Sequence, residues 1–283
     1  ASRMYIASTG TQNAAIGSGG ASPGVTNNTS VYNGTNWSTG GNLPLSLAYA
    51  TSFGTQNDVI QNGGYVSPAT IACSLTYDGV AWGHLPTSPA CKFESGGAGT
   101  STSGFFASGG SPTSNSTTEM FDCTTSTCKG VWSFGNDLIT ARCELAGAGT
   151  QNAALAFGGN NCRTCTEEYN GSSWTTGGNL IVGRYKLGRA GTQDAALAFL
   201  GFNNQPNQVT CTEEYDGSSW SAGGAASIAR DGLAGFGTQN AGLAAGGEPS
   251  TSDATEEYNG TSWSAGGTMI TGRDSVVGAG TQN

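Results

Sequence analysis

The sequence predicts an all-β fold, a β-propeller of six four-stranded blades, from three observations. A Gly-Thr pair recurs at spacings of 42 to 50 residues, beginning at Gly10, Gly54, Gly99, Gly149, Gly191, Gly237 and Gly280. Segments after each pair alternate small and large residues with the two-residue period of a β-strand. Each of the six complete units also carries one of the six tryptophans. Four short strands in a period of this length are typical of a propeller blade.

The fourth unit illustrates the expected order of strands within a blade. Strands A, B, C and D are expected at residues 145–149, 153–159, 166–170 and 173–177, and an Asn-Gly turn joins the last two. A lone four-stranded sheet cannot bury both of its faces. We therefore expect the blades to stack around an axis, with Ala and Gly allowing close approach and aromatic residues filling the gaps.

The whole chain, 1–283, is expected to form one propeller domain. The blades are placed at about 3–44, 45–88, 89–138, 139–180, 181–226 and 227–270, with an extra strand in 271–283. This strand is surplus in a six-bladed ring, because a strand A segment occurs at both ends of the chain. Either it docks beside the first blade and closes the ring, or the polypeptide continues past Asn283 into a seventh blade. Six blades are the preferred interpretation.

The repeat resembles the kelch repeat of the galactose-oxidase type. The resemblance rests on the paired glycines, the Tyr, the Trp about five residues later, and a basic residue before each next blade. That residue stands at Arg3, Lys92, Arg142, Arg184, Arg230 and Arg273, and Leu47 replaces it in the second unit. The segments Gly-Thr-Gln-Asn-Ala-Ala-Leu-Ala-Phe-Gly-Gly and Thr-Glu-Glu-Tyr-Asn-Gly-Ser-Ser-Trp also resemble repetitive kelch-like proteins of marine bacteriophages. The resemblance covers essentially the whole chain and implies a kelch-like propeller. Propellers host many unrelated activities, so it is much less specific for function.

Composition argues against several kinds of partner. The net charge is -9, and the ten Lys and Arg residues are spread without a basic run, which disfavours nucleic acid. No apolar stretch approaches the roughly 20 residues that span a bilayer, so membrane insertion is not expected. An even number of cysteines, eight, together with abundant Ser, Thr, Asn and Gly, favours an extracellular location. The resemblance to bacteriophage proteins implies the virion surface as one such location.

The cysteines predict three disulfide bridges. Two are local: one across a four-residue turn, and one in a Cys-X-X-Cys segment that could also be a redox or zinc motif. The local disulfide is favoured there because no helix start and no second ligand pair are evident. The third would join two neighbouring blades where strand A begins. The predicted pairs are Cys123 with Cys128, Cys162 with Cys165, and Cys91 with Cys143, and Cys73 and Cys211 receive no pairing.

The residues that could suggest catalysis have structural explanations. Glu-Glu pairs recur in three units, at Glu167/Glu168, Glu213/Glu214 and Glu256/Glu257, whereas a catalytic pair occurs at one site. Alternation along strand C sends the two side chains of a pair to opposite faces, so one is expected to contact the repeated Arg. Copper chemistry of the galactose-oxidase type needs imidazole ligands, and the only histidine is His84, expected in a Gly-His-Leu-Pro turn. We therefore expect no enzyme activity, no cofactor and no metal.

One face of the propeller is expected to carry recognition. The A to B and C to D turns repeat almost unchanged, whereas the B to C and D to A connections differ between blades and would share the other face. Binding residues concentrate on loops held by a rigid scaffold. The candidate ligand-binding residues are Tyr65, His84, Arg163, Tyr185, Lys186, Asn203, Asn204 and Gln205. The alternative is that these are surface loops that simply tolerate variation.

Two functions are compatible with these features. The first is a non-enzymatic structural or adhesive module on a virion, such as a tail fibre, or on another extracellular assembly. Its partners would be other virion or surface-assembly proteins and a cell-surface glycan or receptor. The alternative is a secreted carbohydrate-binding, lectin-like propeller.

Overall fold

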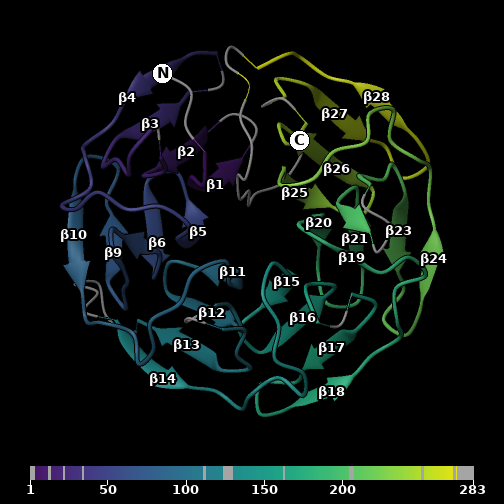
Figure 1. Cartoon of the computed structure of the whole chain (residues 1–283), viewed down its shortest axis with the longest axis horizontal. Coiled ribbons are helices and arrows are strands. Elements are labelled where there is room, and N and C mark those ends of the chain that lie inside the picture. The colour runs from purple at the N-terminus through teal and green to yellow at the C-terminus, as the bar shows by residue number, and fades with distance from the viewer. Residues whose placement is uncertain are drawn as a thin grey trace.

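The computed structural model is a ring of six four-stranded antiparallel sheets around a central axis (Figure 1). It describes residues 4–11, 14–21, 23–33, 35–110, 113–123, 130–161, 163–203, 207–249, 252–269 and 272. The prediction of an all-β, six-bladed propeller is confirmed. The extra strand predicted in 271–283 lies outside the described residues, apart from residue 272. In the described part of the chain, no helix is long and apolar enough to cross a bilayer.

In the first half of the ring each blade runs from the axis outward in chain order. Blade 1 contains β1 (Ala7–Thr11), β2 (Ala14–Ser18), β3 (Thr29–Tyr32) and β4 (Trp37–Thr39). Blade 2 contains β5 (Thr51–Thr55), β6 (Asp58–Asn62), β9 (Ser74–Tyr77) and β10 (Trp82–Leu85). A small hairpin, β7 (Tyr65–Val66) and β8 (Ala69–Thr70), occupies the B to C connection of blade 2. Blade 3 contains β11 (Gly96–Thr100), β12 (Ser103–Ala107), β13 (Thr118–Asp122) and β14 (Val131–Phe134).

The second half of the ring repeats this order. Blade 4 contains β15 (Ala146–Thr150), β16 (Ala153–Phe157), β17 (Thr166–Tyr169) and β18 (Trp174–Thr176). Blade 5 contains β20 (Gly188–Gly191), β21 (Ala196–Phe199), β23 (Thr212–Tyr215) and β24 (Trp220–Ala222). Beside blade 5, β19 (Arg184–Tyr185) pairs with β22 (Phe202–Asn203). Blade 6 contains β25 (Ala234–Thr238), β26 (Ala241–Ala245), β27 (Thr255–Tyr258) and β28 (Trp263–Ala265).

The inner strands β1, β5, β11, β15, β20 and β25 surround the axis (Figure 1). They are rich in Gly and Ala because the blades converge there. A Cβ added at Gly235 would lie 2.4 Å from the backbone nitrogen of Arg189 in the preceding blade. The small residues of strand A therefore set how closely neighbouring blades approach and how wide the central channel is.

Two repeated side chains join neighbouring blades. The Nε1 atoms of Trp174, Trp220 and Trp263 each donate to a threonine hydroxyl at the start of strand C in the preceding blade, at 2.9 Å. The glutamine of the Gly-Thr-Gln turn also donates hydrogen bonds to the preceding blade. The Nε2 atom of Gln193 donates to the carbonyls of Ala154 and Tyr169 at 3.0 and 2.8 Å. The face with the repeated turns is therefore held together by its repeated residues, in agreement with its interpretation as scaffold.

One glutamate of each repeated pair contacts the repeated Arg, as predicted, and the structure gives the second a separate role. Glu213 forms a buried ion pair with Arg184, with 2.8 Å between Oε1 and Nη2, and Arg142 with Glu167 and Arg230 with Glu256 repeat it. The second glutamate points to the other face of the sheet. Glu214 there accepts a hydrogen bond from the Tyr258 hydroxyl of the next blade at 2.5 Å. These carboxylates therefore stabilise the fold within and between blades.

Blade 2 shows what replaces the ion pair when it is absent. Leu47 stands in place of the repeated basic residue, and Leu75 occupies the strand C position of the paired glutamate. Both leucines are 1% exposed and belong to one apolar cluster. The position therefore accepts either a complete ion pair or two aliphatic side chains.

The predicted bridge between Cys91 and Cys143 is wrong, because both are free thiols. Cys91 stands one position before Lys92, whereas Cys143 stands one position after Arg142. The two cysteines therefore occupy repeat positions two residues apart, which corresponds to about 6–7 Å along an extended strand. Cys73 and Cys211, which the sequence left unpaired, are also free. Cys123 and Cys165 are each disulfide-bonded. Their predicted partners Cys128 and Cys162 lie outside the described residues, so those pairings stay predictions.

Candidate functional site

The variable connections lie together on one face of the ring. In successive blades the D to A connection forms a β-bridge with the start of the B to C connection. The bridged pairs include Ala48 with Tyr65, Phe93 with Gly110, Tyr185 with Phe202, and Asp231 with Glu248. The prediction that these connections share a face is therefore supported directly by their pairing.

A ring of equivalent residues surrounds the opening of the central channel on this face. Each lies two positions after the repeated basic residue, or after its replacement Leu47. We call these residues the mouth ring: Tyr5, Tyr49, Glu94, Glu144, Lys186 and Gly232. From Tyr49 round to Gly232, each backbone N–H donates to the mouth-ring carbonyl of the preceding blade, at N to O distances of 3.0 to 3.3 Å.

The backbone of the mouth ring adopts an uncommon conformation. All six residues have φ between 51° and 61°, the left-handed region, although five of them are not glycine. The five successive backbone hydrogen bonds from Tyr49 to Gly232 support this conformation, at the point where the chain turns into strand A. Each blade thus contributes one residue to the mouth: Tyr in blades 1 and 2, Glu in blades 3 and 4, Lys in blade 5 and Gly in blade 6.

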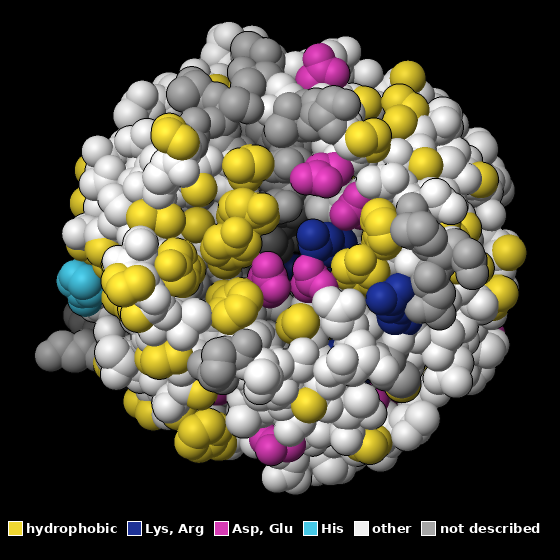
Figure 2. Space-filling model, viewed as in Figure 1, with side chains coloured by type: hydrophobic (Ala, Val, Ile, Leu, Met, Phe, Trp, Pro, Cys, Tyr) yellow, Lys and Arg dark blue, Asp and Glu magenta, His cyan; other side chains and the backbone are white. Residues whose placement is uncertain are grey.

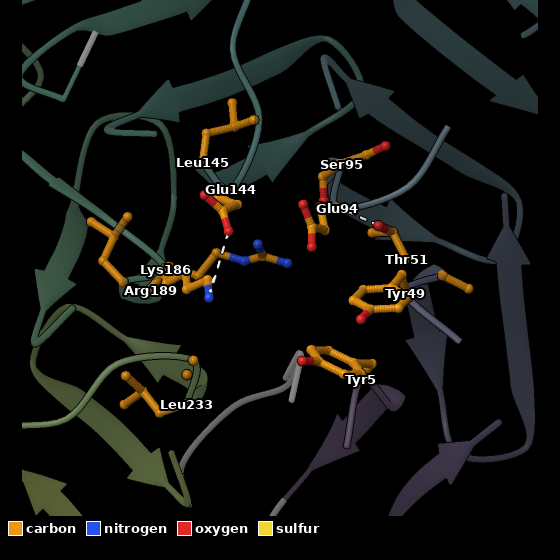
Figure 3. Close-up of a pocket in the computed structure, with 14 residues that line it drawn as sticks. Tyr5, Tyr49, Thr51, Glu94, Ser95, Glu144, Leu145, Lys186, Arg189 and Leu233 are labelled. Carbon is orange, nitrogen blue, oxygen red and sulfur yellow. Dashed lines mark hydrogen bonds and ion pairs between the residues drawn. The ribbon is translucent and has the colours of Figure 1, made fainter. Parts of the chain in front are cut away.

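Inside the mouth ring lies a hollow of about 760 Å³, open to solvent. Its wall combines mouth-ring side chains with Leu145, Leu187 and Leu233 from the starts of successive inner strands and with Arg189 (Figure 3). In the space-filling view, acidic and basic side chains gather around the centre of this face, and hydrophobic side chains flank them on one side (Figure 2). A concave lining of apolar and aromatic side chains with a few polar groups is typical of a small-molecule site.

Aromatic side chains form one side of the hollow. The rings of Tyr5 and Tyr49 stack with centroids 3.9 Å apart and planes 24° apart. The ring of Phe93 meets Tyr49 edge-on at 6.2 Å. Burial raises the pKa of Tyr49. Its hydrogen bond with Tyr5 and the proximity of Tyr65 raise this pKa further. We call Tyr5, Tyr49, Tyr65 and Phe93 the aromatic crescent.

Charged side chains form the opposite side. Lys186 Nζ lies 3.6 Å from Glu144 Oε1. Burial lowers the pKa of Lys186, but Glu144, Asp231 and other carboxylates outweigh it, so the pKa is raised overall. Burial raises the pKa of Glu94 to about 7, Glu144 adds to this effect, and Lys186 opposes it. Glu94 is therefore about half protonated at neutral pH, and it can then donate as well as accept a hydrogen bond.

Glu94 is expected to make the propeller less stable as the pH rises. Its pKa is about 7 when folded, against an ordinary value of 4.5, so unfolding releases a proton. The stability that it contributes is complete below about pH 4.5 and is lost as the pH passes 7. In Glu94→Gln this loss is absent, and we expect its melting temperature to exceed that of the wild type by roughly 2–5 °C at pH 8. Calorimetry of both proteins from pH 5 to 8 checks this, and parallel curves would contradict it.

Arg189 forms the floor of the hollow. Its side chain extends from β20 in blade 5 toward the middle of the hollow (Figure 3), and its Nη2 donates to the carbonyl of Gly97 in blade 3 at 3.2 Å. It also lines a second hollow, of about 540 Å³, between the inner strands. Burial lowers the pKa of Arg189 to about 10. Over the described ranges, no carboxylate lies within ion-pair distance of its guanidinium.

The predicted binding residues are only partly brought together. Lys186 belongs to the mouth ring and lines the hollow, whereas Tyr65 lies near Tyr49 and does not line it. Arg163, Tyr185 and Asn203 form a separate cluster on the same face. The Arg163 guanidinium lies 4.6 Å from the centroid of the Tyr185 ring, and its Nη1 donates to the Asn203 carbonyl at 2.9 Å. This cluster does not line the hollow.

The remaining candidates do not join the site. His84 lies in β10, the outermost strand of blade 2, so its placement in a turn is wrong. It is exposed at the circumference of the ring (Figure 2), with its Nδ1 3.9 Å from Cys73 Sγ. Asn204 and Gln205 lie outside the described residues. The described part of the chain contains no group of three or more His, Cys, Asp or Glu residues that could hold a metal.

Sequence reasoning missed most of the hollow, although the sequence contained two signals for it. The first is the mouth-ring position, which varies between blades at a fixed distance from a repeated residue. The second is Arg189. The equivalent strand A positions hold only small residues, namely Ser8, Ser52, Gly97, Gly147 and Gly235. A single large cation in a position otherwise reserved for Ser or Gly marks blade 5 as different.

The chemistry of the hollow is suited to binding a polar ligand with one flat, less polar face. It combines stacked aromatic rings, a carboxyl group near its titration point, an ion pair and a guanidinium with uncommitted donors. A scan of the chain against protein-family models finds no match, and a search of curated proteins finds none either, so function must be inferred from this geometry.

Proposed function

We propose that this propeller is a non-enzymatic binding module displayed on a virion or another extracellular assembly. Its ligand is recognised at the hollow inside the mouth ring, on the face that carries the variable connections. One observation carries the proposal. The turns on the opposite face repeat and hold the blades together, whereas the mouth ring places two tyrosines, two glutamates, a lysine and a glycine around a solvent-open hollow.

Several features favour binding without catalysis. The repeated glutamates Glu167, Glu213 and Glu256 are engaged in buried ion pairs. His84, the only histidine, lies at the circumference rather than at the hollow. The hollow itself is built on closely packed inner strands and on a ring of backbone hydrogen bonds. A preorganised scaffold of this kind lowers the cost of ordering a binding site.

A secreted carbohydrate-binding propeller is the second candidate, and the aromatic crescent favours it. The stacked rings of Tyr5 and Tyr49 offer a broad apolar surface beside the polar groups of Glu94, Glu144 and Lys186. A sugar ring presents the same combination, because it has a face of C–H groups and a periphery of hydroxyls. Both candidates use the same hollow and differ in whether the propeller is attached to an assembly.

Binding through the hollow can be tested with the labelled chain on a glycan array and on intact cells. We expect saturable binding that the double variant Tyr49→Ala, Lys186→Ala reduces about tenfold or more. Val80→Ala is the matched control. Val80 is 76% exposed and lies in a C to D turn on the opposite face, so this change should leave binding intact. Equal binding by the wild type and the double variant would overturn the proposed site.

Attachment to an assembly is tested separately. Gold-labelled antibodies against the folded domain should decorate the outside of intact particles or cells from the source. Labelling that appears only after the particles or cells are opened would contradict the extracellular assignment.

A further inference from the structure

The Arg189 side chain is the feature of the hollow that the fold does not explain. Among the described basic residues, Lys92, Arg142, Arg184 and Arg230 each pair with a glutamate of their own blade. Within the described ranges Arg189 has no carboxylate partner, and its Nη2 donates to the Gly97 carbonyl. A guanidinium carries five N–H donors, so most of its donors stay available toward the two hollows.

Keeping an unpaired cation in the channel is costly. Burial lowers the pKa of Arg189 to about 10, which reports the penalty for its charged form. Ser or Gly in the equivalent positions of the other blades avoids this penalty, and the fold is complete with them. An anionic group on a ligand would neutralise the charge, and a carboxylate matches the planar fork of the guanidinium with two parallel hydrogen bonds.

The rest of the hollow restricts which anion fits. Glu94 and Glu144 line the same hollow, and their charges disfavour a dianion such as phosphate. Their oxygens are suited to hydroxyl groups, as is the Lys186 ammonium. Opposite them, Tyr5 and Tyr49 offer a stacked aromatic surface for a ring with an apolar face. A singly charged carboxylate attached to a hydroxylated ring meets all of these requirements.

We propose that the hollow binds an acidic sugar residue, with its carboxylate on Arg189 and the face of its ring against Tyr49. This inference rests on the proposed function, because it names the ligand class of the same hollow. Arg189 supplies charge at the floor, Tyr5 and Tyr49 supply one wall, and Glu94 with Glu144 and Lys186 contacts the ring hydroxyls at the mouth.

Titration calorimetry with simple sugars tests the proposal on the full chain. The probes are methyl β-D-glucuronide, methyl β-D-glucoside, which lacks only the charge, and acetate, which lacks the ring. We expect the glucuronide to bind about tenfold more tightly than either of the others. Arg189→Gly should remove this preference, and Gly is already present at the equivalent position in three other blades, so the variant should fold.

A second pair of variants examines the aromatic wall. Tyr49→Leu should weaken binding of the glucuronide about fivefold to tenfold through loss of the stacking surface. Phe134→Leu is the matched control, because Phe134 is 62% exposed on the outer strand β14, and it should bind like the wild type. Circular dichroism of each variant establishes that it is folded.

The outcomes separate this inference from the proposed function. Preferential glucuronide binding that is lost in Arg189→Gly supports the inference. Equal binding of glucuronide and glucoside, or unchanged binding in Arg189→Gly, overturns it while leaving the hollow as a binding site. If none of the three probes binds, the acidic-sugar assignment fails, and the array experiment decides separately whether the hollow binds anything.

Discussion

Glu213→Leu is expected to destabilise the propeller by about 3–5 kcal/mol, because it leaves a buried charge without its partner. The side chains of Arg184 and Glu213 are 0% and 2% exposed, with 2.8 Å between Nη2 and Oε1. Glu213 also accepts hydrogen bonds from the backbone N–H groups of Ile181 and Val182 at 2.7 and 3.2 Å. Removing the carboxylate therefore leaves the guanidinium and two peptide N–H groups without their acceptor. Urea unfolding followed by tryptophan fluorescence measures the loss.

The double variant Arg184→Leu, Glu213→Leu should be more stable than Glu213→Leu alone. Blade 2 already contains this arrangement, with Leu47 and Leu75 buried in place of the ion pair. The double variant still loses the hydrogen bonds from Arg184 to the carbonyls of Leu200 and Cys211, so it should not reach the wild type. A double variant no more stable than the single one would show that the lost charge is not the main cost.

Trp220→Ala is expected to cost about 3–5 kcal/mol, because it opens a cavity between two blades. The Trp220 ring is 6% exposed, and its centroid lies 5.0 Å from that of Phe157 and 4.9 Å from that of Tyr215. Its Nε1 also donates to the Thr166 hydroxyl of blade 4 at 2.9 Å. Thermal unfolding monitored by calorimetry should show one lowered transition.

Trp→Phe variants separate the hydrogen bond from the packing. Trp220→Phe keeps most of the ring but leaves the Thr166 hydroxyl without its donor, at a cost of about 1–3 kcal/mol. Trp132→Phe is the matched comparison. The Nε1 of Trp132 is buried without a hydrogen-bond partner, and Ser74, which stands where Thr166 stands, bonds to Asn62. We therefore expect a smaller cost at Trp132, and equal costs at the two positions would contradict this role of the hydrogen bond.

The fold could be predicted from local pattern because each blade repeats the same short-range information. Alternating residues such as those of 153–157 determine strands, the Asn-Gly turns determine hairpins, and one Trp per unit marks the interface between blades. Alternation also separated the roles of Glu213 and Glu214, since neighbouring residues of a strand point to opposite faces. Two predictions were wrong, the turn at His84 and the bridge between Cys91 and Cys143. Both concern segments where the repeat is less regular.

The sequence by itself determined a ring of six four-stranded blades, the face on which the variable connections lie, and the pairing of repeated Arg with Glu. Only the tertiary structure brought together Tyr49, Glu94 and Lys186, which come from three different blades, and placed Arg189 beneath them with no carboxylate of the described residues within ion-pair distance. The physical reason is that strands and turns depend on residues a few positions apart. The hollow instead depends on the arrangement of blades in a ring, which brings one mouth-ring residue from each blade to a common axis across separations of 40 residues or more.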